Sequence, residues 1–109
     1  MKIVDRKTFL TLPEGTIYSY YVPQISNGLM VKQETLSDDW IYQDLLFEVY
    51  GDSSNDVMQL LTQAEEHGTS FRLDLDCGTR DGMFDNEQMF MVYEKEDITR
   101  LVNKLLSLM

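Results

Sequence analysis

The sequence predicts one α+β domain: a mainly antiparallel sheet of about five strands, two main helices and a short N-terminal helix. We expect the order α-β-β-β-α-β-β-α. Three observations favour this fold. The 109 residues leave room for a single domain spanning 1–109. Strand-like runs follow one another with a hairpin signal between them. Segments with helical apolar spacing separate the groups of strands, which is typical of an α+β fold with helices on one face of the sheet.

The first third of the chain predicts a short helix followed by a hairpin. Asp5 is a suitable N-cap for a helix over residues 6–10, and Pro13 prevents its continuation. Residues 17–22 are aromatic and β-branched, as strands prefer. Asn27-Gly28 predicts the hairpin turn, with residues 29–35 as the returning strand.

The middle of the chain predicts a strand, a helix and a second strand. Residues 40–49 read as the third strand, with a helix as the alternative. The acids Asp52 and Asp56 are expected to cap the helix that follows. Gly68 is a plausible C-terminal stop. Residues 70–75 alternate polar and apolar, which predicts a half-buried strand. One buried face of the helix is predicted by the spacing of Val57, Leu60, Leu61 and Ala64.

The C-terminal third predicts a polar loop, a central strand and a final helix. Residues 76–88 are polar, whereas residues 89–93 are apolar on both faces, as in a central strand. The final helix is expected to begin near residues 94–97, where acids favour the positive end of its dipole. Its expected buried stripe consists of Ile98, Leu101, Val102, Leu105 and Met109.

The net charge of −10 is unevenly distributed. Residues 1–33 carry a balance of +2, and residues 34–109 carry −12. An acidic surface repels phosphate backbones and attracts basic proteins, so we expect a basic protein partner and no direct nucleic-acid binding. Acidity that serves only solubility is an equally available reading.

Most enzyme and metal chemistry lacks the required residues. His67 and Cys77 are the single histidine and the single cysteine, so an internal disulfide and the usual zinc sites are excluded. No nucleotide-binding or nucleophile motif is present. The acids of residues 76–87 do not follow the spacing of a calcium loop. We therefore expect no enzyme activity, no metal and no cofactor. No apolar run is long enough for a membrane span or a signal peptide, and a cytoplasmic location is expected.

Two groups of residues are candidate partner-binding sites. The first is Asp38, Asp39 and Trp40, because an aromatic beside carboxylates suits a basic interface. The second is Asp76, Asp81, Asp85 and Glu87, in a loop between predicted strands. These acids have no evident structural duty in the sequence. The alternative for Trp40 is that it is a core residue and that the aspartates only form a turn.

Three stretches resemble small acidic proteins encoded by bacteriophages and prophages. They are the opening of residues 8–18, the loop Arg80-Asp81-Gly82-Met83-Phe84-Asp85, and residues 92–95 before a final helix. Residues 29–70 are not matched. The resemblance implies a context, namely an accessory protein that acts on a host component.

The leading hypothesis is a non-enzymatic protein that docks an acidic face on a basic host protein, such as a defence or nucleic-acid-binding protein. An immunity protein that neutralises a cognate toxin is one alternative. A carboxylate-based, metal-dependent hydrolase is the alternative from another class.

Overall fold

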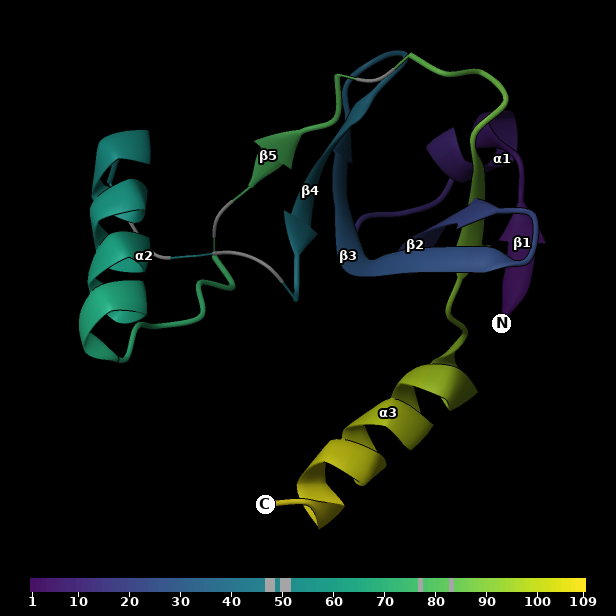
Figure 1. Cartoon of the computed structure of the whole chain (residues 1–109). Helices are drawn as coiled ribbons and strands as arrows, with labels where there is room; N and C mark the ends of the chain where they lie inside the picture. Colours follow the sequence, from purple (N-terminus) through teal and green to yellow (C-terminus); the bar gives the residue numbers. More distant parts are fainter. Residues whose placement is uncertain (47–48, 50–51, 77, 83) are drawn as a thin grey trace.

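The computed structural model contains an antiparallel sheet of six strands and three helices within the described part of the chain (Figure 1), so the α+β class is confirmed. The structure describes residues 1–46, 49, 52–76, 78–82 and 84–109. The sheet has one strand more than expected. The elements are β1 (Lys2–Val4), α1 (Arg6–Leu10), β2 (Ile17–Val22), β3 (Ile25–Thr35), β4 (Trp40–Asp44), α2 (Ser54–His67), β5 (Thr79–Arg80), β6 (Met89–Val92) and α3 (Lys95–Ser107).

The strands lie in the order β1-β6-β2-β3-β4-β5. β6 lies between β1 and β2 and pairs antiparallel with both, which confirms the apolar run at residues 89–93 as an inner strand. β1 and β5 are not among the strands that the sequence predicts. These strands have three and two residues, too few for an alternating pattern, and they form because a neighbouring strand offers unpaired backbone groups.

The hairpin turn is not where the sequence predicts it. β2 and β3 are joined at Pro23 and Gln24, where Gln24 has φ 68°. Proline followed by a residue with positive φ is the pattern of a type II turn. Gly28 (φ 78°) instead lies within β3, where the register with β2 shifts. Asn27-Gly28 therefore forms a bulge, because a glycine with positive φ suits one kind of bulge as well as a hairpin turn.

The strands predicted at 40–49 and 70–75 are shorter or absent. β4 ends at Asp44, and residues 47 and 48 lie outside the described residues. Residues 70–75 form no strand, and Leu73 makes a single isolated bridge to Val49. The alternating pattern of residues 70–75 finds no long strand to pair with, and Leu73 remains 50% exposed.

An aromatic cluster forms the core on one face of the sheet. Phe9 of α1 stacks on Phe90 of β6 with a centroid distance of 4.0 Å, and it meets the edges of Tyr18 and Trp40 at 4.6 and 4.9 Å. All four rings are fully buried. Such ring pairs add about 0.5–1.5 kcal/mol each beyond the burial of their area. Phe9 therefore anchors α1, capped by Asp5 as expected, to the sheet.

Lys32 is buried beside this core. Its ammonium group donates hydrogen bonds to the backbone oxygens of Leu12 (2.9 Å) and Gln33 (3.4 Å), and also to the Thr35 hydroxyl. Burial lowers the pKa of Lys32 from its ordinary value. The hydrogen bond to Leu12 ties the 12–16 turn to β3, so the lysine has a structural role.

The ends of the two longer helices agree with the prediction in part. The N-cap of α2 is Ser53, whose hydroxyl accepts from the Asp56 backbone amide at 3.2 Å, so capping by Asp52 or Asp56 was the wrong expectation. Gly68 ends the helix in the left-handed conformation, as predicted. α3 begins after Glu94, whose backbone amide donates to Asp97 at 2.9 Å.

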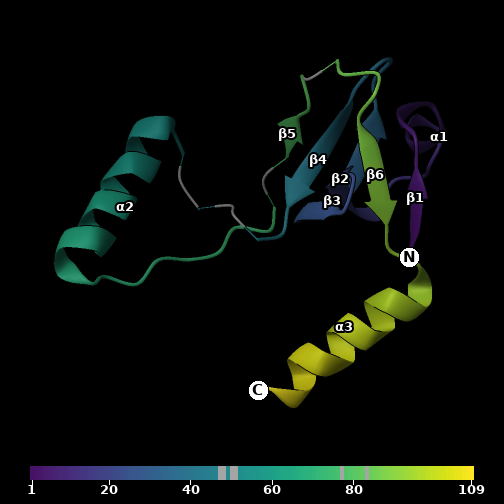
Figure 2. The same ribbon diagram turned by 45° about the vertical axis from the view of Figure 1, so that its right-hand side comes forward.

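The two longer helices do not cover the sheet, which corrects the expected arrangement. Figures 1 and 2 show α2 displaced from the sheet edge and α3 extending beyond β6. No residue of either helix is fully buried, contrary to prediction. Val57 and Ala64 of α2 and Ile98 and Leu101 of α3 are half-buried, and the rest of the two apolar stripes is exposed. The radius of gyration of 15.8 Å exceeds the value of about 13 Å for a compact domain of this length.

Candidate binding cleft beside the β2–β3 hairpin

A cleft of about 410 Å³ opens between the β2–β3 hairpin, α1 and the loop that leads to β6. It contains apolar, cationic and anionic groups together. The residues that line it are Arg6, Tyr20, Val22, Ile25, Ser26, Asn27, Trp40, Asp81, Asp85 and Gln88. Because these residues come from five separate parts of the chain, only the folded sheet assembles the cleft.

The base of the cleft is rigid because it is formed by the core. Trp40 is fully buried, and its indole N–H donates to the Tyr18 hydroxyl at 2.9 Å. The Tyr18 and Tyr20 rings meet edge to face, with centroids 5.7 Å apart. Packed aromatic rings with satisfied polar atoms keep a fixed geometry, so the base is preformed.

Tyr20 and Asp81 form the polar centre of the cleft. The Tyr20 hydroxyl donates to Asp81 Oδ2 at 2.5 Å, and the Asp81 backbone amide donates to the Trp40 carbonyl at 2.9 Å. Burial raises the pKa of Tyr20 above its ordinary value, and the neighbouring Tyr18 and Asp81 raise it further. The phenol is therefore held as a neutral donor, and Asp81, 6% exposed, is fixed in the wall.

Arg6 supplies the cation of the cleft. Its guanidinium lies over the Trp40 ring, 5.0 Å from the ring centroid, and donates to the backbone oxygen of Asp38. The side chain is buried, because α1 is pressed onto the sheet by Phe9. The cation–π contact and the carbonyl together hold Arg6 in one place.

The rim of the cleft is acidic and apolar. Asp85 is exposed, and its carboxylate accepts from the Glu87 backbone amide at 3.0 Å. Val22 and Ile25 at the hairpin tip are 57% and 62% exposed. The side-chain amide of Gln88 donates to the Tyr21 backbone oxygen at 3.1 Å, which ties the loop to the hairpin. With Asp81 and Asp85 against Arg6, the charged residues of the cleft carry one excess negative charge.

Three of the predicted site residues meet in this cleft: Trp40, Asp81 and Asp85. Trp40 lies in the core, which was the alternative reading for it. The other predicted residues lie elsewhere. Asp76 borders a separate shallow depression beside β3 and β4, together with Glu14 and Glu34. Glu87 is exposed in the loop before β6, and Asp38 is exposed at the turn before β4.

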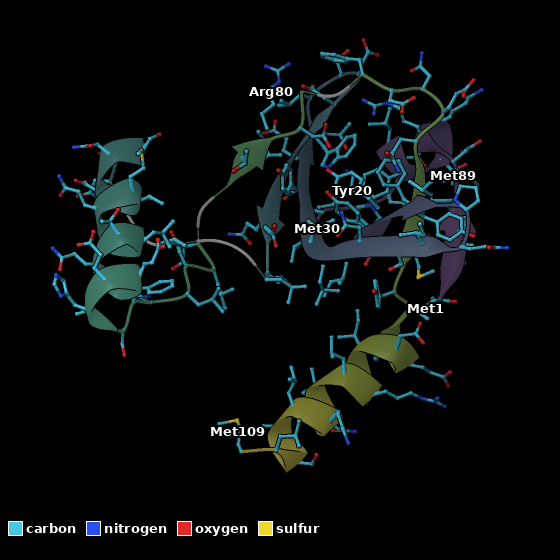
Figure 3. The ribbon with its side chains drawn as sticks, viewed as in Figure 1. Met1, Tyr20, Met30, Arg80, Met89 and Met109 are labelled. Carbon is cyan, nitrogen blue, oxygen red and sulfur yellow. The ribbon has the colours of Figure 1, made fainter. Side chains whose placement is uncertain are left out.

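Asp39 has a structural partner that the sequence did not reveal. It is buried, and Arg80 of β5 donates to its two carboxylate oxygens at 2.5 and 3.2 Å. The hydrogen bond from Arg80 to Asp39 raises the pKa of the guanidinium. Figure 3 shows Arg80 beside β5, at one edge of the sheet, and Tyr20 near the middle of the sheet. Asp39 and Asp81 thus attach the β5 segment, so the expectation that these acids have no structural duty was wrong for both.

Sequence reasoning missed Arg6, Val22 and Ile25 as cleft residues. Arg6 reads as one of several N-terminal basic residues, Val22 reads as an ordinary strand residue, and Ile25 falls in the connection between the predicted strands 17–22 and 29–35. The one available signal was Pro23, which marks the end of the β2 strand and brings Val22 and Ile25 to a turn.

Within the described residues, no three His, Cys, Asp or Glu side chains lie together as a metal site would require. Cys77 lies outside the described residues. None of the helices that the structure describes is both long enough and apolar enough to span a membrane.

Comparison with known proteins gives no family: no family model, curated protein or solved structure is significantly similar to this chain.

Proposed function

We propose that the chain is a non-enzymatic, acidic protein-binding module, and that its cleft receives a basic side chain of a partner protein. The cleft supports this proposal, because it places Asp81 and Asp85 beside the exposed apolar side chains of Val22 and Ile25. A lysine or arginine fits such a site, since its aliphatic stem can pack on apolar groups while its charged head meets carboxylates.

The charge of the whole chain supports the same class of partner. A net charge of −10 repels nucleic acid and speeds encounter with basic surfaces. The proposed partner is a basic host protein, such as a defence or nucleic-acid-binding protein. The protein would act as a phage or prophage accessory inhibitor that covers the partner's basic surface. A cognate toxin is one form of basic partner, and an adjacent toxin gene would identify it.

Two short peptides test the cleft directly. One contains an arginine flanked by leucines, and the other has glutamate in place of the arginine. We expect the arginine peptide to bind and the glutamate peptide not to bind. Binding should weaken as salt is added, because exposed charges are screened over about 8 Å at physiological ionic strength. Equal binding of both peptides would contradict the proposal.

A charge-reversal pair locates the binding. Asp85→Lys changes an exposed acid of the cleft, whereas Glu34→Lys makes the same charge change at an exposed position outside it. We expect the Asp85 variant to lose at least tenfold in affinity, about 1.4 kcal/mol, and the Glu34 variant to bind within about twofold of the wild type. The same pair then tests capture from a bacterial lysate, with and without nuclease. If both variants capture partners like the wild type, the acidity serves solubility only.

A further inference from the structure

The apolar stripes of α2 and α3 are only partly covered: Val57, Ala64, Ile98 and Leu101 are half-buried, and the other members are exposed. On α2, Leu60 and Leu61 are 36% and 37% exposed, and on α3, Val102 and Leu105 are 47% and 56% exposed. In Figures 1 and 2 the two helices lie apart from each other and from the sheet. Isolated helices of about 12–15 residues are marginal in water, so helices of this length need packing for stability. The two stripes are therefore not fully covered within the described part of the chain.

The charges beside the two stripes are opposite in sign. Asp56 precedes Leu60 by four residues and Glu65 follows Leu61 by four, so acids lie on both sides of the α2 stripe. α2 has no lysine or arginine. On α3, Lys104 follows Leu101 by three residues and Lys95 precedes Val102 by seven.

Basic residues therefore lie on both sides of the α3 stripe. Asp97 is also near this stripe, and its carboxylate is 2.7 Å from the Met1 amino group, which offsets its charge.

We infer that α2 of one copy packs on α3 of a second copy, so that the chain forms a reciprocal dimer. The helices have 14 and 13 residues, which correspond to nearly equal lengths of about 20 Å. Both edges of α2 are acidic and both edges of α3 are basic. The charges therefore match whether the two helices run parallel or antiparallel. In a two-fold dimer each chain contributes one helix to each contact, and both stripes are covered.

Two charge-reversal variants of the full chain test this inference. The first is Lys95→Glu with Lys104→Glu, which makes both helices acidic. The second is Asp56→Lys with Glu65→Lys, which makes both helices basic. We expect the wild type to sediment as a dimer and each variant to dissociate at least tenfold more readily. An equimolar mixture should recover the dimer, because each variant then supplies the helix that complements the other.

The outcomes separate this dimer from other ways of covering the stripes. A wild type that is monomeric at all concentrations overturns the inference and leaves docking within the chain or on another protein. If the variant Asp56→Lys with Glu65→Lys stays dimeric, the contact is between two α3 helices, and this result also overturns the inference. A chain with all four reversals should again dimerise, which controls for folding of the altered helices. None of these residues lines the cleft, so the result is independent of the proposed function.

Discussion

Asp81 and Asp85 lie in the same cleft, yet we expect the removal of Asp81, and not that of Asp85, to destabilise the fold. Asp81 is 6% exposed and accepts the Tyr20 hydroxyl at 2.5 Å, whereas Asp85 is exposed on the rim. A hydrogen bond to a charged group contributes about 1.5–3 kcal/mol. Asp81→Ala also leaves the half-buried Tyr20 hydroxyl without this acceptor.

The expected destabilisation by Asp81→Ala is therefore about 2–3 kcal/mol, or about 10 °C in melting temperature for a domain of this size. Asp85→Ala should stay within about 0.5 kcal/mol of the wild type, as surface substitutions usually do. Thermal and denaturant unfolding of both variants give these values. The Asp85 variant should nevertheless bind the arginine peptide more weakly than the wild type, although its stability is normal.

A double-mutant cycle assigns the effect to the Tyr20–Asp81 contact. Tyr20→Phe removes the donor and keeps the ring, so the double variant should be less destabilised than the two single changes predict. We expect a coupling of about 1–2 kcal/mol, within the usual range for residues in direct contact. If Asp81→Ala melts like Asp85→Ala, or if the cycle shows no coupling, the hydrogen bond does not hold the loop and the reasoning is wrong.

Three further perturbations follow from the same contacts. Arg80→Met should destabilise the protein more than the exposure of the Arg80 side chain suggests, because the substitution leaves the buried Asp39 carboxylate unpaired. Asp39→Asn in the same background should recover part of this loss, as measured by denaturant unfolding. Ser53→Ala should lower helicity in α2 by NMR while the melting temperature of the sheet is unchanged, since no α2 residue is buried. The pKa of Tyr20 is raised above its ordinary value of 10.0 in the folded state. The neutral Tyr20 phenol therefore stabilises the fold below pH 10, and this contribution is lost as the pH rises further. Tyr20→Phe should reduce the fall in unfolding free energy above pH 10.

The parts of the fold that are determined by residues adjacent in the sequence could be predicted. Asp5 and Gly68 occupy the helix ends that their local chemistry favours, and the apolar run at 89–93 forms an inner strand. The wrong predictions have two causes. Two positions had equally suitable local chemistry for a turn, or a predicted strand had no neighbouring strand to pair with. Gly28 suited a turn and a bulge equally, and the hairpin turn forms at Pro23 and Gln24 instead. Residues 70–75 had the alternation of a strand but too little strand beside them.

The candidate site divides in the same way. The sequence predicts Trp40 in one candidate site and the loop acids Asp81 and Asp85 in another, and the fold brings all three into one cleft. The structural roles of Asp39 and Asp81 could not be predicted, because their partners lie 41 and 61 residues away in the sequence. Carboxylates with such distant partners look unassigned in a linear reading, so sequence alone overstated the number of acids available for binding.

The cleft and the two exposed helices bear on each other if the inferred dimer forms. Each dimer then presents two copies of the cleft, and a partner with repeated basic segments can occupy both. The second contact becomes intramolecular, so the apparent affinity for such a partner rises without any new contact in the cleft. Lys95→Glu with Lys104→Glu should then weaken capture by a surface densely coated with the arginine peptide. The affinity of that variant for the free peptide should equal that of the wild type, whereas Asp85→Lys weakens both. Equal capture of the dimer-deficient variant and the wild type on the dense surface would show that the two clefts act separately.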